Sequence, residues 1–264
     1  MTIVEANNIQ INYELNENGN EETIVFIHGL SDSLNYWRVL SSNLDYRCLS
    51  FDLRGHGLSA MDEREVTIDL YTEDLYSLLK RLNIEEAVFV GLSLGGNIAM
   101  NFALRHPDMV RGIIVMSSFS RFNPHLRKIF NDFYESVEDG FESFFDTILP
   151  YTLPDDMLSE NRETLDFLKK ELAPLSNVEG IKAGIKAGYM FNITDELNAI
   201  RVPSLVIAGE DDDLTDMDIQ KEIFENIGDC DMVVFENTKH NILIGKNIEA
   251  VLGVIEEFMY KVSD

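Results

Sequence analysis

A serine placed between two glycines is the feature of this chain that most directly suggests chemistry. Residues 91–96 read GLSLGG, so Ser93 has a glycine two positions before it and another two positions after it. An apolar run at residues 87–90 precedes the motif, and a helix-forming stretch at residues 97–104 follows it. A G-x-S-x-G pattern at a strand-to-helix junction is typical of a nucleophile elbow, a tight turn that exposes the serine Oγ and points helix N–H groups at developing negative charge. The pattern predicts Ser93 as a nucleophile.

A serine nucleophile needs a general base, which in proteins is most often a histidine. His240 follows the last strand-like run of the chain, and the loops that follow neighbouring strands of a sheet lie close together. We therefore predict His240 as the base. The other histidines lie at the end of the first long strand, in a tight turn, at the end of a helix and early in an aromatic-rich region: His28, His56, His106 and His125.

The elements that must position these residues alternate between strand and helix. Strand-like apolar runs occupy residues 23–27, 47–53, 87–90, 112–116, 204–208 and 232–235, and residues 2–6 and 9–15 form a hairpin pattern. Helical spacing of apolar residues occurs at 35–44, 67–83, 94–105, 217–227 and 247–260. Such alternation predicts an α/β fold, with a mostly parallel sheet and helices on both faces. We expect this core to comprise residues 1–118 and 199–264.

The rhythm changes between residues 119 and 198. No continuous buried-strand pattern occurs there, and aromatic residues recur at helical spacing instead. We expect residues 119–198 to be a helical insertion that forms a cap over the carboxyl ends of the strands. Such a cap would present an apolar roof to the site.

Composition restricts the range of partners. The 264 residues include 21 basic and 47 acidic side chains, for a net charge of −26, which disfavours nucleic acid and anionic membranes as partners.

The two cysteines, Cys48 and Cys230, lie in strand-like runs, and we expect two buried thiols rather than a disulfide or a metal site. No run approaches the length of a membrane span and no leader pattern opens the chain. We expect a cytoplasmic protein, a monomer or homodimer, without metal or cofactor, that acts on a small molecule.

Several motifs together resemble those of the α/β-hydrolase fold superfamily. They are His28-Gly29, the segment FDLRGHGLS at residues 51–59, the elbow at 91–96, Arg105-His106-Pro107, GEDD at residues 209–212, and His240. Within this superfamily, the chain is similar to small capped members such as carboxylesterases, enol-lactonases and pimeloyl carrier-protein methyl ester esterases. The resemblance implies a mostly parallel sheet of about eight strands flanked by helices, with the cap inserted after the sixth strand. It gives residues 54–59 a structural role only.

The resemblance also implies a catalytic acid and an oxyanion hole. In this fold the acid lies between the serine and the histidine in chain order. Residues 209–214 read GEDDDL, and the usual spacing of three residues after the glycine selects Asp212. Many members have a proline after the catalytic aspartate, whereas this chain has Asp213, so Asp213 and Asp211 remain alternatives. The oxyanion hole would comprise the backbone N–H groups of Leu94, directly after the nucleophile, and of Leu30, in the loop after the first long strand.

These residues predict a serine hydrolase of a small uncharged or weakly polar ester, thioester or lactone, with an acyl-enzyme on Ser93. One alternative is a triad-dependent lyase of the menaquinone-pathway type, which handles polyanions and would need cleft cations such as Arg121, Arg127 or Lys128. Another is a non-catalytic ligand receptor built on the same fold.

Overall fold

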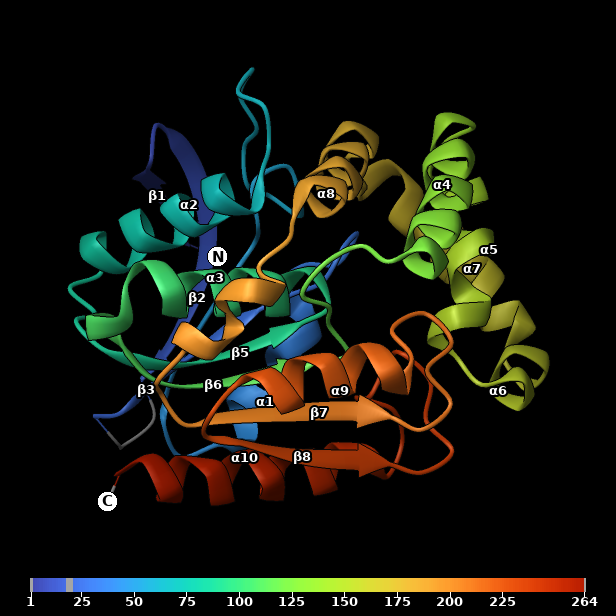
Figure 1. Ribbon diagram of the computed structural model, residues 1–264. Coiled ribbons are helices and arrows are strands. Elements are labelled where there is room, and N and C mark those ends of the chain that lie inside the picture. The colour runs from blue at the N-terminus through green and yellow to red at the C-terminus, as the bar shows by residue number, and fades with distance from the viewer. Residues whose placement is uncertain (1, 18–20, 264) are drawn as a thin grey trace.

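The computed structural model describes residues 2–17 and 21–263 and contains an eight-stranded sheet of order β1-β2-β4-β3-β5-β6-β7-β8 (Figure 1). Strands β1 and β2 pair antiparallel, β2 pairs antiparallel with β4, and the remaining pairs are parallel. This confirms the predicted α/β architecture. The strands are β1 (Thr2–Ala6), β2 (Ile9–Glu17), β3 (Thr23–Ile27), β4 (Arg47–Phe51), β5 (Ala87–Leu92), β6 (Val110–Met116), β7 (Ser204–Gly209) and β8 (Cys230–Phe235).

Helices cover both faces of the sheet. On one face α1 and α10 pack over a core that includes Trp37, Leu40 and Ile255, and on the other α2, α3 and α9 pack over a larger core. The core helices are α1 (Arg38–Asn43), α2 (Ile68–Arg81), α3 (Leu94–Arg105), α9 (Met217–Asn226) and α10 (Asn247–Ser263), with 3-10 turns η1 (Leu34–Trp37) and η2 (Pro107–Met109).

Strand β3 shows why its sequence is continuously apolar. Val25 and Ile27 enter the larger core, whereas Ile24 and Phe26 enter the core beneath α1 and α10. Because successive side chains of a strand point to opposite faces, a strand covered on both faces needs apolar residues at every position.

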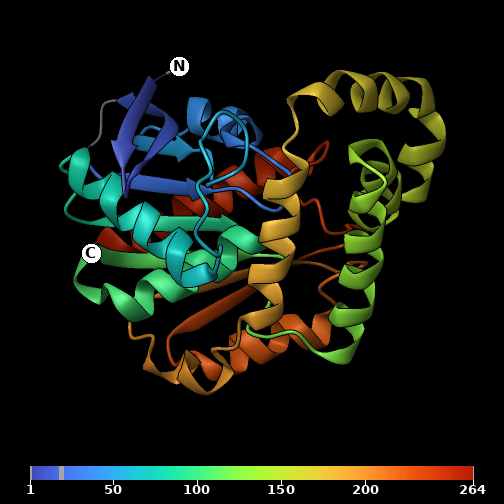
Figure 2. The ribbon, with the colours of Figure 1, turned by 90° about the horizontal axis from the view of Figure 1, so that it is seen from above.

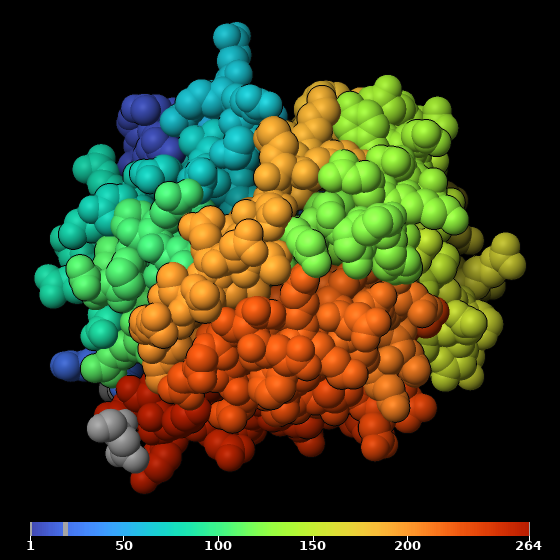
Figure 3. Space-filling model, viewed as in Figure 1, coloured from blue at the N-terminus to red at the C-terminus, as the bar shows by residue number. Residues whose placement is uncertain are grey.

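Five helices lie between β6 and β7, in the interval of the predicted cap, and they sit over one end and one side of the core (Figure 2). Aromatic side chains pack against one another within them, as in the edge-to-face pair of Phe133 and Phe144, whose centroids are 5.9 Å apart. The space-filling view shows these helices packed directly on the core on the face that carries α9 (Figure 3). The helices are α4 (Pro124–Glu138), α5 (Phe141–Thr152), α6 (Asp155–Glu160), α7 (Arg162–Leu172) and α8 (Val178–Met190), with η3 (Ala173–Leu175) and η4 (Thr194–Ala199).

The cysteines are both free, Cys48 buried and Cys230 only partly buried. The expectation of two buried thiols is therefore wrong for Cys230, which opens the edge strand β8, where one side of the ladder has no neighbour. In the part of the chain that the structure describes, no helix has the length and apolar character of a membrane span.

Candidate active site

Ser93 has the strained backbone expected of a nucleophile elbow. Its φ and ψ are 52° and −116°, a conformation that non-glycine residues rarely adopt and that is maintained only by surrounding contacts. The Ser93 N–H donates to the Met116 carbonyl oxygen at 2.8 Å, and the Ser93 carbonyl accepts from Ser118 Oγ at 2.8 Å. A methyl group on Gly95 would lie 2.1 Å from the Ile27 carbonyl oxygen, so this close approach requires glycine. The elbow thus fixes Ser93 at the start of α3.

Asp212 and His240 form a buried pair at the ends of β7 and β8. The His240 Nδ1–H donates to Asp212 Oδ2 at 2.9 Å, and the two residues are 6% and 4% exposed. Burial raises the pKa of the Asp212 carboxyl, but the charge and hydrogen bond of His240 and the bonds from Thr215 outweigh burial and leave that pKa below its usual value. A carboxylate here fixes the imidazole with Nδ1 protonated and leaves Nε2 as the proton acceptor.

The neighbouring carboxylates lie elsewhere. Asp211 and Asp213 are exposed, and the carbonyl of Asp213 contacts His125 Nε2 at 2.8 Å. The structure therefore brings Asp212, and neither of its neighbours, to His240. Despite the missing proline, the turn is closed by Asp212 Oδ1, which accepts from the N–H groups of Leu214 and Thr215, each at 2.9 Å.

Thr215 is a contributor that the sequence did not reveal. Its Oγ1 donates to Asp212 Oδ2 at 2.8 Å and lies 3.3 Å from His240 Nδ1. Gln220 Nε2 donates hydrogen bonds to the Thr215 carbonyl oxygen at 3.1 Å and to the Ser118 carbonyl oxygen at 2.7 Å. Because Ser118 also holds the Ser93 carbonyl, a continuous series of hydrogen bonds connects the backbone of the nucleophile to the acid. The only feature of the sequence that pointed to Thr215 was its position three residues after Asp212.

The direct bond between nucleophile and base is not made. Among residues 2–17 and 21–263, no hydrogen bond joins Ser93 Oγ to His240 Nε2. Such bonds are often long in unliganded enzymes and tighten when substrate binds.

The proposed oxyanion donors lie beside the elbow. A methyl group on Gly29 would contact Ser93 Cβ at 3.5 Å, which places the Gly29–Leu30 turn directly against the nucleophile. A methyl group on Gly184 of α8 would lie 2.7 Å from Leu30 Cδ1 and 3.5 Å from Leu94 Cδ2. The two leucines therefore flank one point beneath the cap, and Leu94 opens α3, where first-turn N–H groups have no partner within the helix.

His28 connects two loops. Its Nδ1–H donates to the Gly29 carbonyl at 2.8 Å, and its Nε2 accepts from the Leu53 N–H at 2.9 Å. Burial, with a smaller effect of His56, lowers the pKa of His28 to about 3, so the ring is neutral at ordinary pH. His28 therefore connects the loop after β3 that contains Gly29 and Leu30, called the oxyanion loop below, to the loop after β4.

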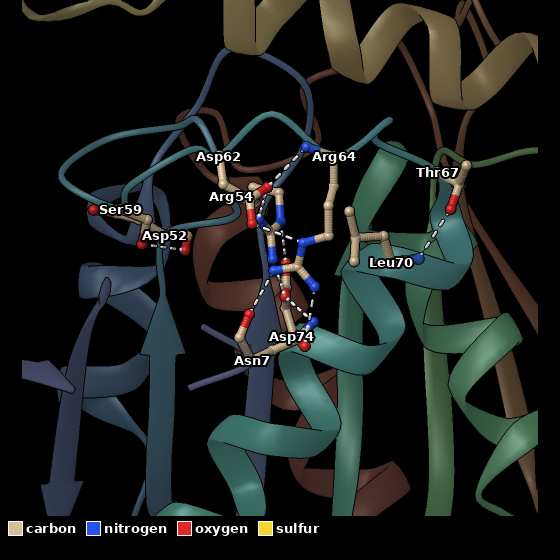
Figure 4. Close-up of polar contacts among 9 residues, drawn as sticks. All are labelled: Asn7, Asp52, Arg54, Ser59, Asp62, Arg64, Thr67, Leu70 and Asp74. Carbon is tan, nitrogen blue, oxygen red and sulfur yellow. Dashed lines mark hydrogen bonds and ion pairs between the residues drawn. The ribbon is translucent and has the colours of Figure 1, made fainter. Parts of the chain in front are cut away.

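An ion-pair network braces that second loop against α2 (Figure 4). The buried Arg54 guanidinium donates from Nε and Nη2 to Asp74 at 2.8 and 2.6 Å, and from Nη1 to Asp62 at 2.7 Å. Arg64 continues the network to Asp62 and Asn7. This geometry agrees with the structural role expected for residues 54–59.

The cap contacts the loop of the base. The carbonyls at the end of α5 accept three hydrogen bonds: Pro150 from Lys239 Nζ at 2.8 Å, Tyr151 from the His240 N–H at 3.3 Å, and Thr152 from the Asn241 N–H at 3.2 Å. The backbone position of His240 consequently depends on the cap.

The three cations that the lyase alternative would need in the cleft lie at the surface instead. Arg121 Nη2 pairs with Glu222 at 2.6 Å, the Arg127 guanidinium lies over the Tyr189 ring at 5.3 Å from its centroid, and Lys128 is exposed. The described residues also contain no cluster of three or more His, Cys, Asp or Glu side chains suited to a metal ion.

Comparison with known proteins agrees with this geometry. The sequence profile of a family described as alpha/beta hydrolase fold matches residues 22–246. A relative from Rhizobium rhizogenes, named "Putative carbamate hydrolase RutD", is 26% identical over 226 residues, which cover 84% of this chain and 86% of the relative. A pimeloyl-[acyl-carrier protein] methyl ester esterase from Hamiltonella defensa is 30% identical over 227 residues, covering 82% and 85%. The crystal structure of the enol-lactonase from Burkholderia xenovorans LB400 superposes with a TM-score of 0.89 at 24% identity, covering 98% of this chain and 100% of that one.

Proposed function

The chain belongs to the α/β-hydrolase fold family and is a hydrolase of that fold, and on this premise we propose that it cleaves a small uncharged or weakly polar ester, thioester or lactone through an acyl-enzyme on Ser93. The observation that carries the proposal is the buried Asp212–His240 hydrogen bond, at the same end of the sheet as the strained Ser93. Triads are recognised by such geometry and roles.

In the proposed mechanism His240 Nε2 takes the proton of Ser93 Oγ as the oxygen attacks the substrate carbonyl carbon. The N–H groups of Leu30 and Leu94 stabilise the oxyanion of the tetrahedral intermediate. His240 returns the proton to the leaving group, the bond to that group breaks, and the acyl group remains on Ser93. Water then releases the acid by the same steps, while Asp212 holds the imidazole tautomer throughout.

The choice of substrate class rests on the cap and on its cations. The Leu30 and Leu94 side chains offer apolar surface beside the elbow beneath α8, whereas Arg121, Arg127 and Lys128 are occupied or exposed. A polyanionic substrate of the lyase alternative would need such cations in the cleft, so this observation favours hydrolysis. The names of the relatives refer to an ester, an enol-lactone and a carbamate as substrates, and each of these has an acyl carbon that a serine can attack.

An acyl-chain series tests the proposal. We expect kcat/KM on 4-nitrophenyl esters to rise from acetate to butyrate or hexanoate and then fall once the chain exceeds the space beneath the cap. A lactone, a thioester and a carbamate belong in the same panel. A strong preference for dicarboxylate or phosphate-bearing substrates would contradict the proposal and favour the lyase, and failure of every substrate would favour the receptor.

Variants test the roles. Ser93→Ala should abolish turnover, and Asp212→Asn should reduce kcat about 10,000-fold because the amide favours the wrong imidazole tautomer. Asp213→Asn is the matched control, since it removes the same charge from an exposed neighbour. A fluorophosphonate that labels a serine other than Ser93, or a crippled Asp213→Asn enzyme, would overturn the assignment.

A further inference from the structure

A cavity of about 510 Å³ opens beside the oxyanion loop. Its walls come from β2, from residues 31–35 and 55–58 of the core, and from residues 172–181 of the cap. Ser93, Asp212 and His240 are not among its lining residues, so the cavity is distinct from the site described above.

The cavity nevertheless adjoins that site along α8. Ile181 lines the cavity, and three residues later a methyl group on Gly184 would contact Leu30, Leu94 and, at 3.7 Å, the Cε1 atom of His56. His56 itself also lines the cavity. Three helical residues, a rise of about 4.5 Å, therefore separate the cavity wall from the point flanked by Leu30 and Leu94. A substrate whose carbonyl is at Ser93 could extend into the cavity.

The charged side chains of the lining are Glu14, Asp32, Asp52 and Arg38, so acidic groups outnumber basic ones. Arg38 is the one basic lining residue, and its Nε pairs with Glu14 at 3.3 Å. The Asp52 carboxylate accepts from Asn12 Nδ2 and from two backbone N–H groups, each at 2.8 Å. Asp32 accepts only from the Ser33 N–H, at 2.8 Å, and no basic side chain of the described chain pairs with it. Burial, opposed by that hydrogen bond and reinforced by Asp52, raises the pKa of Asp32 to about 7. An uncompensated carboxyl of this kind favours a cationic ligand.

His56, a wall residue of the same cavity, has a buried acceptor. The residue is 3% exposed, its Nδ1–H donates to the Arg54 carbonyl at 3.1 Å, and its Nε2 has no hydrogen-bond partner. Since burial lowers the pKa of His56, the ring is neutral and Nε2 carries a lone pair. A buried acceptor without a partner is costly, and a donor supplied by a ligand would remove that cost.

Five aliphatic side chains also line the cavity: Leu34, Leu58, Leu172, Leu175 and Ile181. The lining further includes Tyr13 and the neutral polar residues Ser31, Ser33, Asn35, Ser176 and Asn177. Leu58, Leu172 and Leu175 are 51%, 40% and 70% exposed, so apolar side chains surround the outer part of the cavity and would be covered by an alkyl chain.

We propose that this cavity binds a primary ammonium group carried on an alkyl chain, so that the enzyme prefers esters, thioesters or lactones bearing such a group away from the scissile carbonyl. The inference rests on the proposed hydrolase function for the reaction. For the substrate it departs from the uncharged class proposed above and rests on the cavity alone. The ammonium would donate to the Asp32 carboxylate, and the alkyl chain would pack on the leucines. Anionic ligands are disfavoured by the same carboxylates.

Binding of simple probes tests the cavity without reference to turnover. In calorimetric titrations of the full chain, hexylammonium chloride should bind at least tenfold more tightly than 1-hexanol. Asp32→Asn should abolish that preference. Asp108→Asn, which removes the same charge from an exposed position at the amino end of β6, should retain it. Equal affinity of the two probes for the unmodified protein, or an unchanged preference in Asp32→Asn, would overturn the proposal.

A matched ester pair extends the test to catalysis. The 4-nitrophenyl ester of 6-aminohexanoic acid and its neutral isostere, 4-nitrophenyl heptanoate, differ only in the terminal group. The ratio of their kcat/KM values should favour the ammonium ester at least tenfold, and Asp32→Asn should bring the ratio to about one. Turnover of both esters at similar rates would refute the ammonium preference while supporting a hydrolase. Turnover of neither, with hexylammonium still preferred in the titration, would refute the hydrolase and leave the cavity assignment intact.

Discussion

Removing only the Thr215 hydroxyl measures how much the second hydrogen bond to the acid contributes. Thr215→Val preserves side-chain shape and the backbone N–H bond to Asp212 Oδ1, but leaves Oδ2 with His240 alone. A hydrogen bond to a charged group contributes about 1.5–3 kcal/mol. If it acts on the orientation of the Asp212–His240 pair, kcat should fall about 10- to 100-fold with KM little changed.

Steady-state kinetics on 4-nitrophenyl butyrate and urea unfolding are the assays. Thr215→Ser restores the hydroxyl and should recover most of the loss in kcat. The stability difference between wild type and Thr215→Val should also depend on pH. Because the folded-state pKa of Asp212 is depressed, its stabilising contribution is present above the unfolded-state pKa and disappears as the pH falls through the folded value, so the difference should shrink in acid. Wild-type kcat in Thr215→Val would refute the reasoning, as would a loss in kcat that Thr215→Ser does not repair.

Three further predictions concern stability. Ser93→Gly should raise the free energy of unfolding by about 1–3 kcal/mol while eliminating turnover, because glycine tolerates φ of 52°; a less stable variant in urea unfolding would contradict the idea of strain at the elbow. Arg54→Met should lower the free energy of unfolding by about 3–5 kcal/mol, because Asp74 is left buried with the Asn7 amide but without its cation, and the double variant Arg54→Met/Asp74→Leu should recover part of this loss. A double variant less stable than Arg54→Met alone would argue against this reasoning. His28, whose pKa falls from 6.5 to about 3 on folding, stabilises the fold above pH 6.5, and roughly 5 kcal/mol should be lost as the pH falls to 3; a free energy of unfolding that stays constant from pH 6 to 4 would exclude this effect.

The spacing of apolar residues along the chain determined how much of the fold could be predicted. Buried parallel strands and amphipathic helices are local patterns, so the sheet and its covering helices followed from the sequence, with strand ends displaced by a residue or two. For example, β8 begins at Cys230 rather than at residue 232, and η1 interrupts the helix expected from residue 35. The position of Ser93 also followed locally, because close backbone approach at the elbow excludes side chains at its flanking glycines.

The rest of the site depends on contacts between distant segments. Choosing Asp212 over Asp211 and Asp213 relied on a family spacing, since all three carboxylates look alike in sequence, and only the folded turn distinguishes the buried one. Gln220 was hidden for the same reason, because its amide reaches Ser118 across 102 positions of the chain. Asp32 gave no signal at all, since its environment is formed jointly by β2, the oxyanion loop and the cap.

The cap meets the core at two places, and separating cap from core would break different contacts at each. At the end of α5, separation would break the hydrogen bonds to Lys239, His240 and Asn241 and would displace the backbone of the base. At residues 172–181, the cap instead borders the cavity, where Leu172 is 40% and Leu175 is 70% exposed. Widening the second border costs fewer polar contacts and leaves His240 in place. Opening the cap at the second border would therefore leave the hydrogen bonds between the His240 loop and α5 intact.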